Sequence, residues 1–326
     1  MSIAGRPATG PDRRHFRPDA IPPETTAANA ELARTLAGAP PVYAVPPAEH
    51  RTAVERGEGA GRSPIVRLEQ AVNRSISGPG GRLTLRVLRP ETARGVYLHI
   101  HGGGWVYGDA EHQDQRLWDL ASASDLAIVS VQYRLAPEHP YPAGPDDCEA
   151  AALWLAAHSE SELGVRRLMI GGDSAGAHLA AVTLLRMRDR HGFADFAAAN
   201  LAYGVYDLTG TPSAIRATGS LVIDIHSMAW FSDRFVPPEL RSDPDVSPLG
   251  ADLRDMPSAL FTVGTLDPLL DDSLFMHQRS LAAGNESELA VYPGGVHGFD
   301  TMPTAQGRQA TTAQHAFLRA AAHGAT

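Results

Sequence analysis

The sequence predicts an α/β fold, with a mostly parallel central sheet and helices on both faces. Short apolar runs of strand length alternate with helical stretches of about 10–16 residues, the pattern of strand–helix–strand units. The 326 residues are 43% hydrophobic and 20% charged, which is enough apolar material for one large core. Chains of this length often fold as one α/β unit.

The first 80 residues differ from the remainder of the chain. They are rich in Pro, Gly, Ala and Arg and contain three Pro-Pro pairs, which disfavour long regular elements. Helices are expected there at about 25–36 and 48–56. We expect residues 1–80 to form a partly helical cap region that lies on a main domain of residues 81–326.

The main domain shows the alternation most clearly. The stretch at 83–89 alternates apolar and polar residues, as in an exposed or edge strand. The runs at 96–100 and 126–131 are continuously apolar, as in strands buried on both faces. Further strands are expected at 167–171, 259–263 and 289–292, and helices at 114–124, 146–159, 175–190, 269–283 and 304–322.

Residues 206–247 break this alternation. The segment is rich in apolar side chains but also contains Pro237, Pro238 and Pro244. We interpret it as an insertion between two core strands. With the N-terminal region it is expected to form a helical cap over the carboxyl ends of the strands, where open α/β sheets bind ligands.

Composition argues against several classes of function. The formal net charge is −9, so the chain lacks the basic surface of a general nucleic-acid binder. The single cysteine, Cys148, excludes an intrachain disulfide and argues against a cysteine-based zinc site. No apolar signal-peptide region follows the N-terminus, and the apolar runs are too short to span a membrane. We therefore expect a cytoplasmic protein that uses no metal or other cofactor and binds neither nucleic acid nor membrane.

Residues 172–176 read Gly-Asp-Ser-Ala-Gly and lie between an expected strand and an expected helix. In this context a Gly-x-Ser-x-Gly motif places its serine on a sharp turn, with the hydroxyl raised above the sheet. The flanking glycines are needed because side chains would clash in so tight a turn. Ser174 is therefore the candidate nucleophile, and a purely structural Gly/Ser turn is the alternative.

Residues 101–105 read His-Gly-Gly-Gly-Trp and follow an expected buried strand directly. Consecutive glycines let the backbone turn its N–H groups toward a ligand. Two such donors and the N–H of Ala175 would form an oxyanion hole for a tetrahedral intermediate. A flexible or phosphate-binding loop is the alternative, although no Gly-Lys-Ser/Thr follows as in a P-loop.

A serine nucleophile needs a base, and the base needs a carboxylate to orient it. His297 follows the last expected strand and Asp267 follows the strand before it. Both should therefore lie at the same edge of the sheet as Ser174, in the nucleophile–acid–base order of α/β hydrolases. Asp271 and Asp272 are rivals for the acid, but one turn into a helix a capping or supporting role is simpler.

Two other histidines stand near the glycine motif. His99 is expected to be a strand residue, and His101 to shape the glycine turn rather than act as a base.

Five motifs together resemble one family. The sequence is similar to the hormone-sensitive lipase-like branch of the α/β-hydrolase superfamily, the bacterial family IV esterases, from about residue 96 to the end. Its Asp173 is typical of the Gly-Asp-Ser-Ala-Gly subgroup. The matching motifs, in the order of the family, are residues 101–105, 133–143, 172–176, 267–271 and 297–299.

The resemblance implies an α/β-hydrolase fold and a serine carboxylesterase. Ser174 would attack the ester carbonyl, His297 would transfer protons and Asp267 would orient His297. The N–H groups of Gly103, Gly104 and Ala175 would hold the oxyanion. The resemblance also implies small-molecule esters of short to medium acyl length, a bracing role for Asp173, a scaffold role for residues 133–143, and a homodimer as a possible state.

The residues of the substrate pocket are less determined by the sequence. Ordinary core packing is the alternative for each of them. The candidates are Trp105, Tyr107, Met228, Phe231, Leu270 and Phe299.

Two other functions stay open. An amide or N-acyl hydrolase would use the same triad, with stronger protonation of the leaving nitrogen. The second alternative is a ligand-binding protein that has the hydrolase fold but no catalytic activity. The plant gibberellin receptors, which resemble this family but lack the catalytic histidine, are an example. The presence of Ser174, Asp267 and His297 disfavours the receptor.

Overall fold

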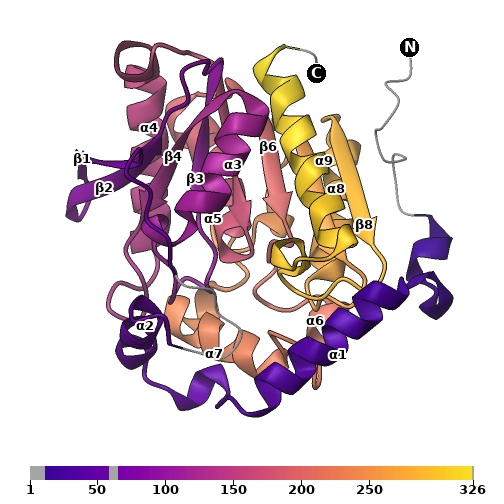
Figure 1. Ribbon diagram of the computed structural model, residues 1–326. Helices are drawn as coiled ribbons and strands as arrows, with labels where there is room; N and C mark the ends of the chain where they lie inside the picture. The colour runs from indigo at the N-terminus through magenta and orange to yellow at the C-terminus, as the bar shows by residue number, and fades with distance from the viewer. Residues whose placement is uncertain (1–11, 59–64, 325–326) are drawn as a thin grey trace.

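The computed structural model describes residues 12–58 and 65–324, which contain one eight-stranded sheet (Figure 1). The order of its strands is β1-β2-β4-β3-β5-β6-β7-β8. β2 pairs antiparallel with β1 and β4, and all other neighbours are parallel. This confirms the predicted, mostly parallel sheet. The strands are β1 (Val72–Gly78), β2 (Gly81–Leu88), β3 (Gly95–Ile100), β4 (Leu126–Gln132), β5 (Leu168–Asp173), β6 (Phe196–Ala202), β7 (Ser258–Gly264) and β8 (Ser287–Tyr292).

Helices cover both faces of the sheet. α3 packs against α9 on one face, and α4 packs against α5 on the other (Figure 1). No helix in residues 12–58 and 65–324 is long and apolar enough to cross a membrane. The helices are α1 (Pro23–Ala37), α2 (Pro47–Glu55), α3 (Asp114–Ser124), α4 (Ala143–Leu163), α5 (Ala175–His191), α6 (Pro212–Ile215), α7 (Ile225–Phe235), α8 (Leu270–Ala282) and α9 (Ala305–Ala322).

The apolar runs of the sequence form the centre of the sheet. Every residue of β3 is buried, as is all of β4 except its last residue, as continuous apolar runs in a parallel sheet require. α4 and α5 end at Gly164 and Gly192, which adopt the left-handed conformation with φ of 71° and 63°. Glycine takes this conformation without the steric cost of a Cβ, which explains where both helices stop.

Three strands differ from the expectation. β2 is not an edge strand, because β1 pairs with its outer side and is itself at the edge of the sheet. β1 is mostly polar and exposed, so no apolar pattern marks it. It also lies inside residues 1–80, so the sheet begins before the predicted domain boundary.

β6 is rich in alanine, a weak strand former, and owes its conformation to parallel pairing with β5 and β7.

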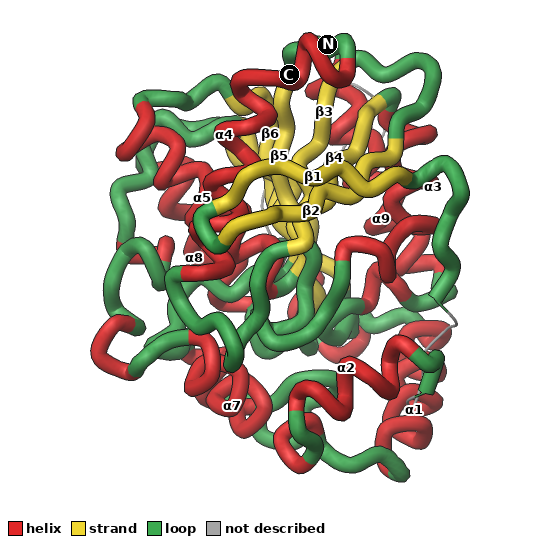
Figure 2. Tube along the Cα trace, turned by 90° about the vertical axis from the view of Figure 1, so that its left-hand side faces the viewer, coloured by secondary structure: helices red, strands yellow, loops and turns green. Residues whose placement is uncertain are grey.

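The predicted cap segments lie together beyond one end of the sheet. α1, α2 and α7 gather there in both views (Figures 1 and 2). The segment 206–247 lies between β6 and β7 and contains α6 and α7. α1 is tied to the loop after β8, because the side-chain amide of Asn29 donates a 2.8 Å hydrogen bond to the carbonyl of Gly294. Residues 1–11 and 59–64 of the predicted cap region lie outside the described residues.

Candidate active site

Ser174 stands on a strained turn between β5 and α5. Its φ of 55° and ψ of −121° lie outside the ordinary regions for a residue with a side chain. A Cβ at Gly172 or Gly176 would come within 2.0 or 1.9 Å of the carbonyl oxygen of Ile100. Glycine is therefore required on both sides of the serine, as the motif predicts.

His297 connects Ser174 to Asp267. Its Nε2 lies 2.9 Å from the Ser174 hydroxyl oxygen, and its Nδ1 lies 3.0 and 3.1 Å from the two carboxylate oxygens of Asp267. Both the histidine and the aspartate are buried. The Asp267 carboxylate also accepts a hydrogen bond from the N–H of Leu269, which fixes its orientation. The three residues that the sequence singled out thus form one hydrogen-bonded chain.

The charge of Asp267 controls the protonation of His297. Burial by itself lowers the pKa of the imidazole, since it disfavours the charged form. The charge and the hydrogen bond of Asp267 outweigh burial, and the carboxylates of Asp173 and Asp300 add to them. The net effect raises the pKa of His297 above its ordinary value of 6.5.

The rival carboxylates face the cap insertion rather than His297. Asp272 is fully buried and accepts hydrogen bonds from the N–H groups of Tyr206 and Asp207, at 2.6 and 3.0 Å, and from the Thr211 hydroxyl, at 2.6 Å. Burial raises the pKa of Asp272 to about 7, although these donors oppose the rise. Asp271 accepts a hydrogen bond from the N–H of a residue in α6. Both therefore support the beginning of the cap insertion 206–247.

The glycine loop adopts a conformation that side chains would prevent. Gly103 and Gly104 have φ of 114° and 60°. A Cβ at Gly103 would lie 2.4 Å from the carbonyl oxygen of Tyr107, and one at Gly104 would lie 2.3 Å from the ring of Phe231. Both glycines line the same cavity as Ala175 and the Ser174–His297 pair.

His101 shapes this loop, as the sequence predicts. Its ring is fully buried and stacks on Tyr133 at a centroid distance of 4.2 Å. The Tyr133 hydroxyl donates a 3.0 Å hydrogen bond to the His101 carbonyl. Nδ1 of His101 lies 2.9 Å from the carbonyl oxygen of Gly102. His99 is a strand residue, with its Nδ1 2.9 Å from the Ser130 hydroxyl.

A charged network behind the triad was not predicted from the sequence. Arg116 lies 2.9 Å from Asp300 and 3.9 Å from Asp173. The Tyr203 hydroxyl donates a 2.6 Å hydrogen bond to Asp300, and its ring meets the His297 ring edge-on at 5.0 Å. Burial alone would raise the pKa of Asp173, but His99, whose Nε2 lies 3.9 Å from the carboxylate, and the charge of Arg116 lower it to about 2. The only local signal for this network is the position of Asp300, three residues after His297.

A cavity of about 1170 Å³ lies between the triad and the cap. Four of the predicted pocket residues line it: Trp105, Tyr107, Met228 and Phe231. The N-terminal region and the insertion supply most of the apolar wall, which includes Leu32, Leu36, Val42, Val45, Ile215, Val222, Ile223 and Met228.

The other two predicted pocket residues, Leu270 and Phe299, are not among the described residues that line this cavity, so the prediction is wrong for them. Phe299 is buried against Tyr292, with 5.0 Å between ring centroids, and Leu270 packs against the core. The residue directly before each of them does line the cavity: Leu269 precedes Leu270, and Gly298 precedes Phe299. Neighbouring residues point their side chains in different directions, so a residue next to a cavity-lining one can face away from the cavity. A sequence motif does not show which of the two faces the cavity.

Metal ligands are not gathered at this site or elsewhere in the described part of the chain. Within residues 12–58 and 65–324, no group of three or more His, Cys, Asp or Glu side chains is arranged to hold a metal ion. Cys148 is a free, buried thiol.

The sequence profile of the family described as alpha/beta hydrolase fold matches residues 97–301. The chain therefore belongs to the α/β-hydrolase fold family, and within it to the hormone-sensitive lipase-like branch that its motifs resemble. Esterase LipI of Mycobacterium tuberculosis is 34% identical over 285 residues, which are 81% of this chain and 86% of LipI. Ethyl acetate hydrolase of Pseudomonas putida is 31% identical over 236 residues, 68% of this chain and 73% of that enzyme.

Solved structures agree with this assignment. An α/β hydrolase from the metagenome of Lake Arreo, Spain, superimposes with a TM-score of 0.83 at 32% identity, covering 94% of this chain and 99% of its own. A thermostable carboxylesterase from a metagenomic library gives a TM-score of 0.77 at 33% identity, covering 85% of this chain and 98% of its own.

Proposed function

We propose that this protein is a carboxylic ester hydrolase that works through an acyl-enzyme on Ser174. The observation that carries the proposal is the hydrogen-bonded chain from Ser174 through His297 to Asp267, which opens into a cavity beside the glycine loop. The names of its relatives, an esterase and an ethyl acetate hydrolase, support the same class of reaction.

In the first half of the reaction, Nε2 of His297 takes the hydroxyl proton as Ser174 attacks the carbonyl carbon. The carbonyl oxygen gains negative charge, which the N–H groups of Gly103, Gly104 and Ala175, residues that line the cavity beside Ser174, would stabilise. The intermediate then collapses and expels the alcohol, which takes its proton from His297. The Asp267 carboxylate stabilises the imidazolium that exists in between.

In the second half, water replaces the alcohol. His297 removes a proton from the water, which attacks the acyl carbon, and the same three N–H groups stabilise the second oxyanion. Collapse of this intermediate breaks the bond to Ser174, and His297 returns the proton to the serine oxygen. The products are a carboxylic acid and the free enzyme.

We expect small-molecule esters of short to medium acyl length, as the resemblance to the family IV esterases implies. The cavity has room for such esters, because its volume of about 1170 Å³ is slightly above the roughly 300–1,000 Å³ that is usual for small-ligand pockets, and its wall is largely apolar. We expect p-nitrophenyl esters to be hydrolysed from acetate to the medium chains, with activity falling toward palmitate. The measurement is the initial rate across that series, with Ser174→Ala assayed beside the wild type. A folded protein that cleaves no ester in the series would contradict the proposal and redirect it to amides or to ligand binding.

Activity should depend on pH through His297. The base must be neutral to accept the serine proton, and the Asp267 carboxylate raises the pKa of His297 above 6.5. The value of kcat/KM should therefore fall as the pH decreases, with a midpoint above 6.5. A pH profile of kcat/KM on an uncharged ester measures that midpoint. A midpoint well below 6.5 would mean that Asp267 is not paired with His297 in the working enzyme.

Three expectations from the sequence and the resemblance stay predictions. They are a cytoplasmic location, a homodimeric state and the absence of nucleic-acid binding.

A further inference from the structure

Trp105 closes the glycine loop in a strained conformation. Its φ is 61°, in the left-handed region that residues with a large side chain rarely adopt. Such a conformation persists only where the surroundings hold it in place. The Trp105 carbonyl accepts a 2.9 Å hydrogen bond from the N–H of Ala136, which fixes the backbone on one side. The indole is held as well, and Trp105 directly follows Gly103 and Gly104 in the same loop.

Two side chains hold the indole. The ring of Phe235, at the end of α7, stacks on it with a centroid distance of 4.4 Å and an angle of 11°. The indole N–H of Trp105 donates a 3.0 Å hydrogen bond to Nδ1 of His178. Trp105 and His178 are both buried, so each of these contacts is shielded from water.

His178 connects three parts of the site. It lies on α5, four residues after the nucleophile, and its backbone N–H donates to the carbonyl of Ser174 at 3.1 Å. Its Nε2 lies 2.8 Å from the carbonyl oxygen of Val246, at the end of the cap insertion 206–247. Since Nδ1 must accept from the indole of Trp105, Nε2 carries the proton and donates to Val246. Burial lowers the pKa of His178 to about 4, in keeping with this neutral ring.

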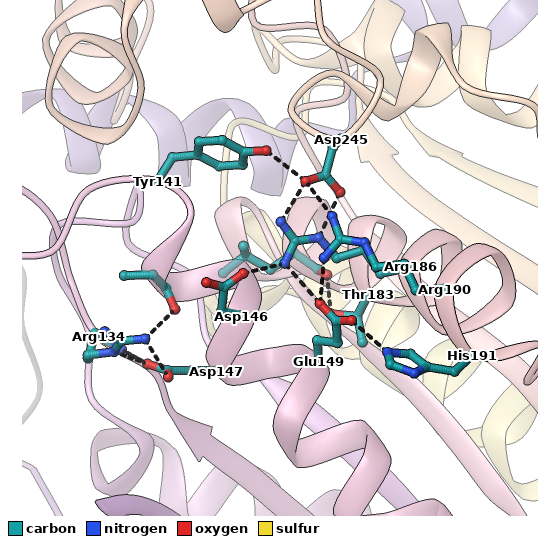
Figure 3. A network of polar contacts seen from close by, with 12 residues as sticks. Arg134, Tyr141, Asp146, Asp147, Glu149, Thr183, Arg186, Arg190, His191 and Asp245 are labelled. Carbon is teal, nitrogen blue, oxygen red and sulfur yellow. Dashed lines mark hydrogen bonds and ion pairs between the residues drawn. The ribbon is translucent and has the colours of Figure 1, made fainter. Parts of the chain in front are cut away.

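The segment that receives this hydrogen bond is itself fixed. Asp245, the neighbour of Val246, accepts two hydrogen bonds from the buried guanidinium of Arg186, at 2.7 and 2.5 Å (Figure 3). It also accepts a 2.7 Å hydrogen bond from the hydroxyl of Tyr141, and the Tyr141 N–H donates to the carbonyl of Phe235. The two points of the cap insertion that contact Trp105 and His178, at Phe235 and Val246, are therefore both anchored to the main domain.

We propose that His178 is a positioning residue. By joining Trp105 to Val246 at the end of the cap insertion, it holds the glycine loop in place beside the nucleophile. The proposal rests on the proposed ester hydrolysis. The residue touches neither substrate nor the reacting atoms, so it acts through Trp105 on the N–H groups of Gly103 and Gly104. These donors matter most when the carbonyl oxygen becomes an oxyanion, so disturbing them should lower kcat rather than raise KM.

The experiment compares three variants on α5. His178→Phe keeps an aromatic ring but leaves the indole N–H and the Val246 carbonyl without a partner, whereas His178→Gln retains one acceptor and one donor. Thr183→Val is the matched control, since among the described residues this buried hydroxyl donates only to the carbonyl of Leu179 on its own helix. The measurements are kcat and KM on a p-nitrophenyl ester, and inhibition by an alkyl boronic acid, which forms a tetrahedral adduct with the serine.

We expect His178→Phe to lower kcat by about tenfold or more, with KM within about twofold of wild type. The inhibition constant of the boronic acid should rise by a similar factor. His178→Gln should recover most of the loss, and Thr183→Val should change neither kcat nor inhibition. If His178→Phe lowers only the melting temperature and leaves kcat and boronate inhibition unchanged, the histidine is an ordinary core residue and the inference is wrong.

Trp105→Phe provides the second test, which also decides the matter if His178→Phe does not fold. It removes the indole N–H but keeps a ring to stack on Phe235. We expect the same fall in kcat and in boronate affinity, and a double variant with His178→Phe should be little worse than either single one. Wild-type kinetics on Trp105→Phe would overturn the inference. A wild-type protein that hydrolyses no ester would instead contradict the proposed function.

Discussion

Ser174→Ala is expected to abolish ester hydrolysis, with kcat reduced by about 10³- to 10⁶-fold. The variant keeps His297 and the glycine loop but has no oxygen to form the acyl-enzyme. What remains is the attack of water in the same pocket. The measurement is turnover of p-nitrophenyl butyrate at high enzyme concentration, together with a search for a burst of p-nitrophenol equal to the enzyme present, which only the wild type should show.

The same variant should remain folded. Ser174 is the residue before the first turn of α5, but its side chain makes no capping hydrogen bond to the helix. Removing it costs one hydrogen bond, to His297, and leaves the strained backbone as it was. Thermal unfolding followed by circular dichroism should show a small change in the melting temperature. A variant that retains substantial turnover would mean that another residue is the nucleophile.

Asp267→Asn is expected to reduce kcat by about 10⁴-fold. The amide is nearly the same size as the carboxylate, so packing is kept. It carries no charge to stabilise the imidazolium, and its NH₂ group can face Nδ1 and favour the wrong tautomer of His297. Since the raised pKa of His297 depends on Asp267, the acid limb of the pH profile should also move to lower pH.

Asp271→Asn is the matched control, four residues along the same chain. Its carboxylate accepts a 2.8 Å hydrogen bond from the N–H of Ser213, which the amide oxygen of asparagine can still accept. We expect near wild-type kcat and a slightly lower stability. If Asp271→Asn is the inactive variant and Asp267→Asn is active, the acid of the triad has been assigned to the wrong aspartate.

Much of the site was predictable from the sequence because its geometry is local. The turn around Ser174 excludes any Cβ on either side, so Gly172 and Gly176 mark it in the sequence itself. The same holds for the glycine loop, where φ is positive at two successive glycines. Asp267 and His297 follow from topology, because loops after neighbouring parallel strands meet at one edge of the sheet. These motifs and the alternation of strands and helices were sufficient for the fold class.

The tertiary structure alone decided the features that depend on contacts between distant residues. β1 has no apolar pattern and β6 has a weak one, so each is a strand because of the strand that pairs with it. Arg116 and Asp300 are 184 positions apart, and His178 and Val246 are 68 positions apart. A local sequence pattern does not show whether a side chain such as that of Arg116 or His178 is exposed to water or buried with hydrogen-bond partners. The residues proposed to carry the chemistry were thus visible in the sequence, whereas those that hold them in position were determined by packing.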